Sequence, residues 1–368
     1  MLVLKLLFCA VLLWPVACGK AGAPRYDVAI IGGGLAGLAA ATQLNGLKVI
    51  LLEKSDRIGG RVFTRTKHGV AIEAGALFAY DPAVLGFAHQ PSRFIAGEQK
   101  MALRHRNRTI ACHHARDCIA QAKIDSRERA NALAWLKNPA LPVTALQSEP
   151  YQILNAFFTA IHAGEMRDYM VTERDTAFSK IPNGHFQAGN GELVDALKQR
   201  SRADIRLNTE VTRIRDEGGA VQISYREARG ESLIEARQVI CTTDAATALK
   251  LLSVVRSESR KFFSSVKYHG GITINMGMKR DPLPGIGYIV HSTANPHVLF
   301  KSAHPQQRMI VLTGYMSVEQ LENPGAIDRK IVTEKAIDSL KDYGIAIATP
   351  EIAFADVEFW DKIGPVIS

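Results

Sequence analysis

Cysteine is scarce in this chain of 368 residues, which contains only five. Two of them, Cys9 and Cys18, lie near the N-terminus, and the other three form a sparse, odd-numbered set. Such a set excludes a disulfide framework as the scaffold of the fold. Within it, Cys112 and Cys118 can pair in an oxidising compartment, which leaves Cys241 over.

Low-complexity tracts and internal repeats are also lacking, which excludes a solenoid and a largely disordered chain. Hydrophobic residues make up 47% and charged residues 22%, as in ordinary globular proteins, and the length allows two domains with well-buried cores. The net charge is +9, which favours anionic ligands or membrane surfaces. We find no nucleic-acid-binding module. The expected partners are therefore a small-molecule substrate and a membrane surface, and not nucleic acid.

The first 23 residues have the layout of a targeting segment. Lys5 provides a weakly positive start, residues 6–17 are apolar, and small residues follow at 21–23. The apolar stretch is shorter than the ~20 residues that span a bilayer as a helix. We therefore expect residues 1–23 to be a signal peptide or a membrane anchor. The protein is then exported, to the periplasm or the secretory pathway, or held at a membrane; a wrongly assigned start codon is the alternative.

A strand–helix–strand unit follows directly after this segment. Residues 28–31 are apolar and rich in β-branched side chains, which predicts a buried parallel strand. Residues 35–44 are rich in Ala and Leu and predict a helix, which Asn45-Gly46 ends. Residues 48–52 predict the second strand. The unit is typical of an α/β fold with a parallel sheet.

Three glycines and one acid occupy the positions that a dinucleotide requires in such a unit. Gly32, Gly34 and Gly37 have G-x-G-x-x-G spacing, and Glu53 closes the second strand ~20 residues later. The first glycine permits a tight turn, the second lets a pyrophosphate approach the backbone, and the third packs the helix on the strand. The helix start offers N–H groups to the phosphates. Glu53 suits ribose hydroxyls and disfavours a 2′-phosphate, so NADP is not expected. The alternative is a glycine-rich turn in an unrelated α/β protein.

A second pair of glycines follows the acid, within the sequence Arg57-Ile-Gly-Gly-Arg61. These glycines allow the backbone to turn near the phosphates, and Arg61 can supply a bidentate phosphate contact. The alternative is a surface turn with a solvated arginine. Because the segment comes directly after a ribose-binding acid, we favour the ligand contact.

Residues 68–73 alternate in polarity and predict a short strand, after which Gly75, Ala76 and Leu77 offer a small-residue approach and an apolar platform. The patterns G-G-G-L-A-G-L-A-A-A, L-L-E-K, R-I-G-G-R-V-F-T and G-V-A-I-E-A-G-A together resemble the flavin-dependent amine oxidase superfamily. That superfamily includes amine oxidases, protoporphyrinogen oxidases and carotenoid-type desaturases. The resemblance implies FAD rather than NAD, because simple NAD-binding folds lack the R-x-G-G-R extension.

The fold that the resemblance implies is α/β, with a Rossmann-like FAD-binding domain interleaved with an α+β substrate domain. The FAD-binding domain has a parallel sheet with helices and is expected to comprise residues 25–80 and 185–265. The substrate domain is expected to comprise residues 81–184 and 266–358. Residues 359–368 are then the start of a truncated return to the FAD-binding domain.

Two later strands carry the resemblance further. Residues 205–214 are expected to form one strand, in which Val211 holds the adenine through its backbone. Residues 238–244 are similar to a strand that ends near the flavin, although Thr242-Thr243-Asp244 departs from the usual small-x-Pro ending. The cofactor-binding residues expected in this chain are Gly32, Gly34, Leu35, Ala36, Gly37, Glu53, Lys54, Gly60, Arg61, Gly75, Ala76, Leu77, Val211 and Thr242.

Residues 81–184 have few glycines and are expected to be helical and basic, with helices at 126–137 and 151–168. The stretch 104–118 is cationic and rich in histidine. Cys and His can ligate zinc, but this spacing fits no common zinc pattern, so no metal site is expected. A solvated basic face is the plainer interpretation, and a surface for anionic lipid or an acidic substrate is the other.

The chemistry that the resemblance implies is hydride transfer from an organic substrate to the flavin. Amine oxidases of the superfamily commonly place a lysine near the flavin. The matching strand here, 268–274, contains none, and Lys267 lies just before it. We therefore favour an FAD-dependent oxidoreductase of a hydrophobic substrate, in the protoporphyrinogen oxidase and phytoene desaturase branch, and identify no catalytic base. An amine oxidase that releases hydrogen peroxide and a non-catalytic FAD-fold protein are the alternatives.

The superfamily also has a closing segment of the form G-D-x-x-x-G-x-x-x-x-A-x-x-S-G, which covers the flavin ring. Residues 358–365 resemble the W-x-x-x-x-P stretch that precedes it, and the closing segment itself is not found in this sequence. A second chain or a missing C-terminal segment is therefore expected to complete the flavin site.

Overall fold

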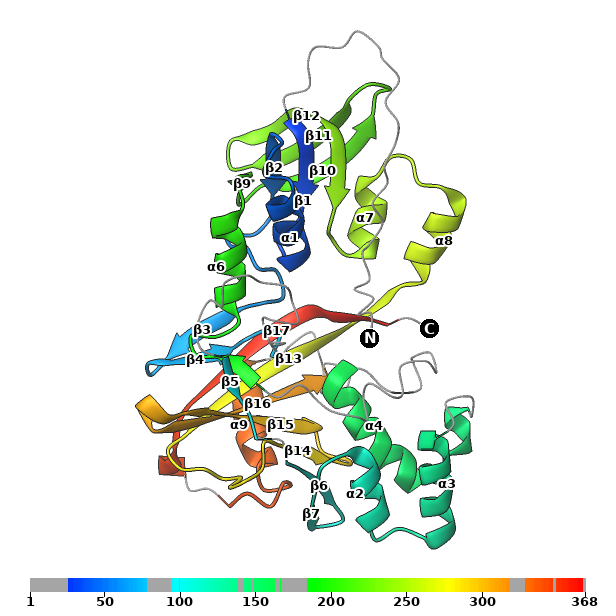
Figure 1. The fold of residues 1–368 in the computed structure, drawn as a ribbon, viewed down its shortest axis with the longest axis vertical. Helices are drawn as coiled ribbons and strands as arrows, with labels where there is room; N and C mark the ends of the chain where they lie inside the picture. The colour runs from blue at the N-terminus through cyan, green and yellow to red at the C-terminus, as the bar shows by residue number, and fades with distance from the viewer. Residues whose placement is uncertain are drawn as a thin grey trace. The chain divides into compact units, whose positions relative to one another are not determined.

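A computed structural model of the chain describes residues 26–77, 94–98, 100–137, 142–146, 148–162, 166, 184–317, 328–346 and 349–366. The chain divides into two compact units, each built from two separate stretches of sequence (Figure 1). The first unit comprises Met1–Phe63 and Gly191–Val266, and the second comprises Thr64–Asn190 and Lys267–Ser368. The expected targeting segment, residues 1–23, lies outside the described residues.

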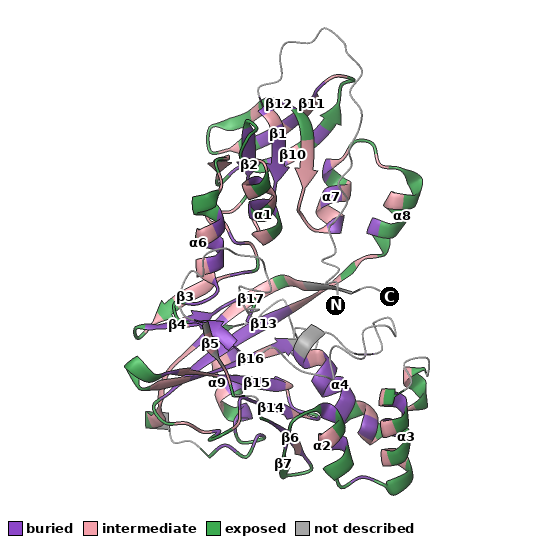
Figure 2. Ribbon diagram, viewed as in Figure 1, coloured by how far each residue is buried: buried purple, intermediate pink, exposed green. Residues whose placement is uncertain are grey.

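The first unit contains a six-stranded sheet in the order β10-β11-β12-β1-β2-β9. Strands β12, β1, β2 and β9 run parallel, while β10, β11 and the first half of β12 form an antiparallel extension. The strands β1 and β2 are almost entirely buried, as their apolar sequences predict (Figure 2). The strand bounds are β1 Tyr26–Ile31, β2 Val49–Leu52, β9 Asp204–Arg206, β10 Glu210–Asp216, β11 Val221–Glu227 and β12 Gly230–Cys241.

Four described helices belong to this unit: α1 Leu35–Gln43, α6 Gly191–Arg200, α7 Ala245–Leu251 and α8 Ser257–Ser265. Helix α1 packs on β1, β2 and α6. Asp244 is the N-cap of helix α7, and its carboxylate accepts a hydrogen bond from the backbone N–H of Thr247 at 3.1 Å. The apolar core of this unit includes Ala29, Ile50, Leu52, Ile214, Ile223, Ile234 and Ala236.

The single strand expected over residues 205–214 is wrong. Asn208 adopts a left-handed conformation, with φ 51°, and divides the stretch into β9 and β10, which lie at opposite edges of the sheet. The backbone N–H groups of Asn208 and Thr209 donate to Ser55 O and Glu53 O at 2.8 and 2.9 Å. These bonds hold the break against the end of β2.

The second unit contains a seven-stranded sheet in the order β17-β13-β16-β15-β14-β6-β7, antiparallel except between β14 and β6. The strand bounds are β6 Met101–His105, β7 Arg108–Cys112, β13 Lys267–Met278, β14 Tyr288–His291, β15 Val298–His304, β16 Met309–Ser317 and β17 Ile352–Val366. Two short pairs accompany the sheet: β3 Thr64–Lys67 with β4 Val70–Glu73, and β5 Phe94–Ala96 with β8 Gly184–Phe186.

The described helices of the second unit are α2 Ala115–Gln121, α3 Ser126–Lys137, α4 Ser148–His162 and α9 Arg329–Ser339, with short 3-10 turns at Val143–Ala145, Pro305–Gln307 and Thr349–Glu351. One apolar core joins α2, α3 and α4 to the sheet around Trp135, Phe157, Phe158 and Phe300. A second core lies around Ile272, Met276, Leu312 and Ala336. The helix expected at 126–137 is confirmed, and the helix expected at 151–168 begins earlier, at Ser148.

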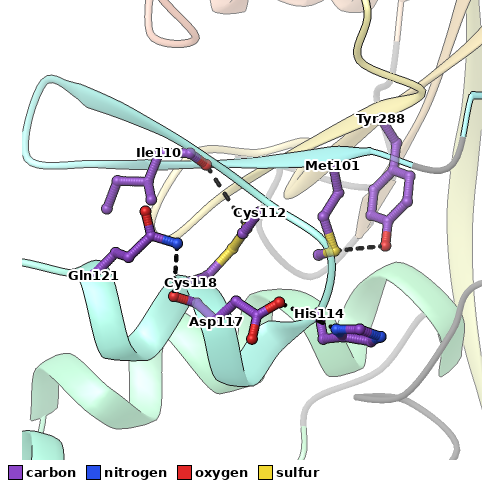
Figure 3. Close-up of a disulfide and its surroundings, with 8 residues drawn as sticks. All are labelled: Met101, Ile110, Cys112, His114, Asp117, Cys118, Gln121 and Tyr288. Carbon is purple, nitrogen blue, oxygen red and sulfur yellow. Dashed lines mark hydrogen bonds and ion pairs between the residues drawn. A yellow bond between two sulfur atoms is a disulfide. The ribbon is translucent and has the colours of Figure 1, made fainter.

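The cationic stretch 104–118, expected to be part of a helical region, instead contributes the hairpin β6–β7 and the start of α2. Arg106 and Asn107 have φ of 45° and 59°, which makes the tight turn between the two strands. Cys112 and Cys118, at the end of β7 and in α2, are joined by a disulfide (Figure 3).

The expected domain boundaries differ from the two units. Residues 64–77 and 185–190, expected in the FAD-binding domain, group with the second unit. Strand β3 is tied to β17, because Arg65 and Lys67 form ion pairs with Asp356 at 3.2 and 3.3 Å. The expected return at 359–368 is also different. Strand β17 continues to Val366 and stays paired with β13, where Val366 lies opposite Lys267.

Candidate functional site

The glycine-rich turn after β1 has the geometry that its spacing predicts. Gly32 adopts φ +105°, and a Cβ at Gly37 would lie 2.0 Å from Gly32 O, so neither position can hold a larger residue without a shift of the backbone. Gly34 is the N-cap of α1, and no described side chain caps this helix. The first-turn N–H groups at Leu35 and Ala36 are therefore available to an anionic ligand.

Glu53 lies against this turn at the end of β2. Its Oε2 accepts a hydrogen bond from the Gly33 N–H at 2.6 Å, and its Oε1 accepts from the Ser55 N–H and hydroxyl at 2.9 and 2.7 Å. The side chain is 9% exposed. The carboxylate and the start of α1 therefore lie at the same end of the parallel strands, where α/β sheets bind ligands.

The second glycine pair packs directly on the first turn. The Gly59 N–H donates to Gly33 O at 2.8 Å, and Gly34 and Gly59 form an isolated parallel bridge. Gly60 has φ +57°, and a Cβ there would lie 3.1 Å from Gly34 Cα. The two glycine loops thus form one backbone surface without side chains, which we call the glycine cradle, residues 32–37 and 59–60.

Arg57 holds the second loop from within, a role that the sequence did not indicate. Its guanidinium donates to Gly60 O at 2.8 Å and to Val62 O at 3.3 Å, and it lies 4.1 Å from the centre of the Phe63 ring. By contrast, Arg61, which we expected to contact phosphate, is exposed, as is Lys54. The two arginines of R-x-G-G-R therefore differ in their surroundings, although the sequence pattern treats them alike.

Thr242 lies at the glycine turn, after the end of β12. Its hydroxyl donates to Ile31 O at 2.9 Å and to Gly32 O at 3.0 Å, so it joins β12 to the start of the turn. Val211 is buried in β10 opposite Tyr225, next to an irregularity in the strand register. A backbone contact from Val211, as the resemblance implies, would come from this irregular position.

The three remaining expected residues, Gly75, Ala76 and Leu77, belong to the second unit. There, the carbonyl groups of residues 73–77 all accept hydrogen bonds from side chains. The donors are Asn275 to Glu73 O at 2.9 Å, Trp360 to Ala74 O at 2.7 Å, Tyr315 to Gly75 O at 3.1 Å, and Asn190 to Ala76 O and Leu77 O at 2.9 and 3.1 Å. Ala76 is exposed, while Gly75 and Leu77 are buried. The segment is therefore fixed along its whole length.

Glu73 is a buried acid that sequence reasoning missed. Its carboxylate accepts from the Asn190 N–H at 2.6 Å and from the Thr64 hydroxyl at 2.9 Å, yet burial outweighs these bonds and raises the pKa of Glu73 to about 7. The rings of His185 and His304 lie nearby, with their centres 5.3 Å apart and their planes tilted by 43°, and burial lowers the pKa of His185 to about 4. Burial also lowers the pKa of His304.

A cavity of about 10 Å³ lies between these groups and is lined in part by Glu73, His185 and His304. That volume suits a single water molecule. Among the described residues, the Nε2 atom of His185 is buried without a hydrogen-bond partner. Only the alternation of residues 68–73 hinted at this cluster, because its members come from three separate parts of the sequence.

Two lysines bear on the question of a catalytic group. Lys267 begins β13 and is exposed. Lys301, in β15, is buried and forms ion pairs with Glu98 and Asp281, both at 2.8 Å. These ion pairs hold Lys301 as a structural cation. The structure therefore identifies neither lysine as a catalytic base.

The described part of the chain holds no group of three or more His, Cys, Asp or Glu side chains able to bind a metal ion. None of its described helices is both long and apolar enough to span a bilayer.

Comparison with known protein families identifies the family of this chain. Residues 30–89 match the NAD(P)-binding Rossmann-like domain, and residues 145–362, more than half of the chain, match the flavin-containing amine oxidoreductase family. The chain belongs to the flavin-containing amine oxidoreductase family. This confirms the resemblance drawn from the motifs around residues 26–78, and membership in a flavin-containing family implies FAD.

Individual relatives in this family are more distant. The chain is 25% identical to (S)-6-hydroxynicotine oxidase of Paenarthrobacter nicotinovorans over 302 residues, which is 67% of this chain and 66% of that protein. It is 43% identical to tryptophan 2-monooxygenase of Pseudomonas savastanoi over 82 residues, which is 20% of this chain and 14% of that protein. The chain thus spans less than two thirds of the length of these curated relatives.

Solved structures of the amine oxidoreductase family share the fold. Cyclohexylamine oxidase from Brevibacterium oxydans superposes with a TM-score of 0.73 at 14% identity, over 92% of this chain and 85% of that one. An Exiguobacterium protein assigned as a protoporphyrinogen oxidase superposes with a TM-score of 0.67 at 15% identity, over 94% and 89%. These matches confirm the predicted class, a Rossmann-like unit combined with a second mixed α and β unit.

Proposed function

We propose that this protein is an FAD-dependent oxidoreductase that binds the ADP half of the cofactor at the glycine cradle and oxidises a small organic substrate. The observation that carries the proposal is the cradle itself. A Cβ placed on Gly34 would have Gly60 Cα, at 4.0 Å, as its nearest described neighbour, so the space beside the start of α1 is open. A pyrophosphate there meets backbone N–H groups, and no side chain obstructs it.

The residues present fit the ADP half of FAD. Leu35 and Ala36 would offer their N–H groups to the phosphates, and the buried Glu53 carboxylate would accept hydrogen bonds from the ribose. Arg61 is exposed close to the cradle in sequence and would add charge for the phosphates. When bound, the flavin supplies the redox chemistry by accepting a hydride from the substrate. The residues of this chain would bind and orient the cofactor and shield the site from water.

We consider two classes of substrate, a hydrophobic compound and an amine. A hydrophobic substrate, as in protoporphyrinogen oxidases, is the choice that the lysine-free interior of β13 supports. Amine oxidation with release of hydrogen peroxide is the second candidate. It is favoured by relatives named for hydroxynicotine, tryptophan and cyclohexylamine. Peroxide release upon addition of a primary or secondary amine separates the two.

Because the relatives are longer than the matched region, we propose that a further segment or a second polypeptide completes the flavin half of the site. We also propose export or membrane anchoring through residues 1–23, with a membrane surface as partner. The net charge of +9 and the disulfide of Cys112 with Cys118 support this location. Cell fractionation of the full chain and of a chain lacking residues 1–23 tests it. Equal recovery of both in the cytoplasm would contradict the proposal.

The cradle is tested with Gly34→Ala. Gly34 has φ −70° and ψ 178°, which alanine adopts freely, and the added methyl has room, so the variant should fold normally. The methyl then occupies the space of the pyrophosphate, and the affinity for FAD should fall at least tenfold. Gly46→Ala is the matched control, because no described atom lies within 4 Å of its Cβ position. Equal FAD affinity in both variants, measured by titration of the apoprotein, would contradict the proposal.

A further inference from the structure

Positive charge is concentrated between the start of β6 and the first turn of α3, in a part of the chain that the proposed FAD site does not use. Residues 101–127 carry six Lys and Arg side chains against two Asp, which is almost half of the net charge of the whole chain. They form the β6–β7 hairpin, helix α2 and the beginning of α3, all within the second unit. A solvated face and a surface for an anionic ligand are the two interpretations of such a stretch.

Two of the six cations already have partners in the protein. The Arg104 guanidinium donates to Asp342 O at 3.1 Å and to Asn107 O at 2.8 Å. Arg106 forms an ion pair with Glu149 at 2.5 Å. Because these two arginines support the turn of the hairpin and the start of α4, we set them apart from the cations that are available to a ligand.

The two acids of this stretch are also occupied. The Asp117 carboxylate hydrogen-bonds to the His114 ring at 3.1 Å (Figure 3). The Asp125 carboxylate accepts hydrogen bonds from the backbone N–H groups of Arg127 and Glu128, at 2.9 and 3.1 Å, where α3 begins. Neither carboxylate forms an ion pair with a Lys or Arg side chain among the described residues.

The four remaining cations are exposed, and none of them forms an ion pair with a described residue. An anionic ligand that contacts them therefore replaces only water and mobile ions, and no ion pair of the protein has to break. We call these four residues the basic cluster: Arg108, Arg116, Lys123 and Arg127.

The elements that carry the basic cluster are fixed to one another. In α2, Ala115, Cys118 and Ile119 are buried, which leaves Arg116 on the outer side of the helix. The disulfide joins Cys118 to Cys112, the last residue of β7, so the hairpin and the helix stay together (Figure 3). Helix α3 packs on α2 in turn. The cations therefore lie on one connected part of the second unit and not on independent loops.

We propose that the basic cluster binds the anionic headgroups of a lipid bilayer. This inference rests on the proposed function, to which it adds a membrane contact that is separate from residues 1–23. Clusters of four or more Lys and Arg bind anionic lipid surfaces, and each such cation strengthens binding by about fivefold, the factor that ~1 kcal/mol gives. The basic cluster has the required charge, and its cations have no competing partner in the described chain.

The arrangement of the cluster favours a lipid surface over other anions. A small acidic substrate needs donors that converge in a hollow, whereas these cations come from three successive elements. None of them lines the cavity beside Glu73. The disulfide under the cluster suits an oxidising compartment, where a membrane surface is present and nucleic acid is uncommon.

The first experiment measures binding of the full chain to two kinds of vesicle, pure phosphatidylcholine and a two-to-one mixture of phosphatidylcholine with phosphatidylglycerol. The wild type should bind the anionic vesicles more tightly, and added salt should reduce the difference. Arg116→Gln combined with Lys123→Gln should lower the affinity for the anionic vesicles about twenty-five-fold and leave the affinity for neutral vesicles unchanged. A wild type that binds both kinds equally would overturn the inference.

Two further variants separate the position of the charges from their number. Lys250→Gln combined with Arg256→Gln removes the same charge from the first unit, where both residues are exposed and have no ion pair with a described residue. This variant should keep most of the preference for anionic vesicles. Arg116→Lys combined with Lys123→Arg keeps the charges of the cluster and should bind as the wild type does. If the first-unit variant loses as much affinity as the cluster variant, binding follows net charge alone and the inference is wrong.

The outcomes also separate this inference from the proposed function. FAD titration tests the redox proposal, and neutral vesicles test anchoring through residues 1–23. If neutral vesicles retain the wild type without any preference for anionic ones, anchoring stands and the basic cluster is not a lipid site. Short double-stranded DNA is the last ligand. DNA binding that is tighter than vesicle binding, and that Arg116→Gln with Lys123→Gln abolishes, would assign the cluster to nucleic acid and overturn the lipid contact.

Discussion

Gly34 and Gly59 form a parallel β-bridge outside any strand, and this one backbone contact unites two glycine motifs that the sequence presents separately. Each loop supplies what the other lacks. The first loop contributes the uncapped start of α1, and the second lines the open space beside it. Because this contact fixes the two loops against each other, the effect of a substitution can be predicted for each position of the cradle.

Gly37→Ala should destabilise the first unit strongly. The added methyl would lie 2.0 Å from Gly32 O, a backbone atom, so the helix or the turn must move, at a cost of at least about 2 kcal/mol. Gly46→Ala should change stability by less than about 1 kcal/mol. Thermal unfolding followed by circular dichroism measures both. A transition of Gly37→Ala that coincides with that of Gly46→Ala would show that the close approach is not maintained in solution.

Arg57→Ala should lower the melting temperature and weaken FAD binding together. The variant loses three hydrogen bonds to loop carbonyls and the contact with the Phe63 ring, which together contribute about 2 kcal/mol. Arg61→Ala should lower the melting temperature less than Arg57→Ala does, because its side chain is exposed, but should weaken FAD binding. The pair thus separates support of the loop from contact with the ligand. If both variants melt alike, Arg57 does not hold the loop.

Glu73→Gln should alter the pH dependence of stability in a defined direction. Burial raises the pKa of Glu73 from 4.5 to about 7, so between these values the folded protein holds a proton that the unfolded chain releases. The wild-type free energy of unfolding therefore falls as pH rises through this window, by on the order of 3 kcal/mol. Glutamine cannot ionise, so the variant lacks this loss.

The titration of His185 also changes the free energy of unfolding with pH, but this contribution cancels when wild type and variant are compared. Burial lowers the pKa of His185 to about 4, so its contribution to stability is lost as pH falls below about 6.5, in wild type and variant alike. The quantity to measure is the difference in unfolding free energy between Glu73→Gln and the wild type, from urea denaturation at pH 5 to 8. It should grow in favour of the variant with rising pH; a constant difference would mean that Glu73 titrates normally.

Removing the disulfide should destabilise the second unit modestly. The bond joins residues six positions apart, and a loop of this size contributes about 2 kcal/mol by chain entropy. Both sulfurs are buried beside α3 and α4, so Cys112→Ser with Cys118→Ser should lower the melting temperature, as should a reductant acting on the wild type (Figure 3). Cys241→Ser is the control. A reductant effect that persists in the double variant would exclude the disulfide as its cause.

Local features were the most predictable from sequence. The turn at Gly32, the helix α1 and the acid at Glu53 follow from backbone sterics and short-range periodicity, which a single stretch of sequence contains. The break at Asn208 was missed because it depends on a left-handed conformation that is stabilised by backbone bonds to Glu53 and Ser55, which lie far away in the sequence.

Long-range features could not be predicted in this way. Trp360 appeared in the sequence only as part of a terminal motif, yet its indole bonds to Ala74 O, 286 positions away. Glu73 looked like one member of an alternating strand, and its raised pKa depends on what covers it, including Asn190. Burial and hydrogen-bond partners of this kind arise from tertiary packing, which periodicity does not encode.

The junction of β1 with β12 has a consequence for biosynthesis. Thr242 bonds to Ile31 O across 211 positions, so β1 leaves the ribosome long before its neighbour on that side exists. At 5–20 residues per second, that delay is roughly 10 to 40 seconds. During this time an apolar strand edge stays unpaired and open to misassociation. The interleaved order of the two units thus creates a demand for chaperones that a contiguous arrangement of the same sheet would avoid.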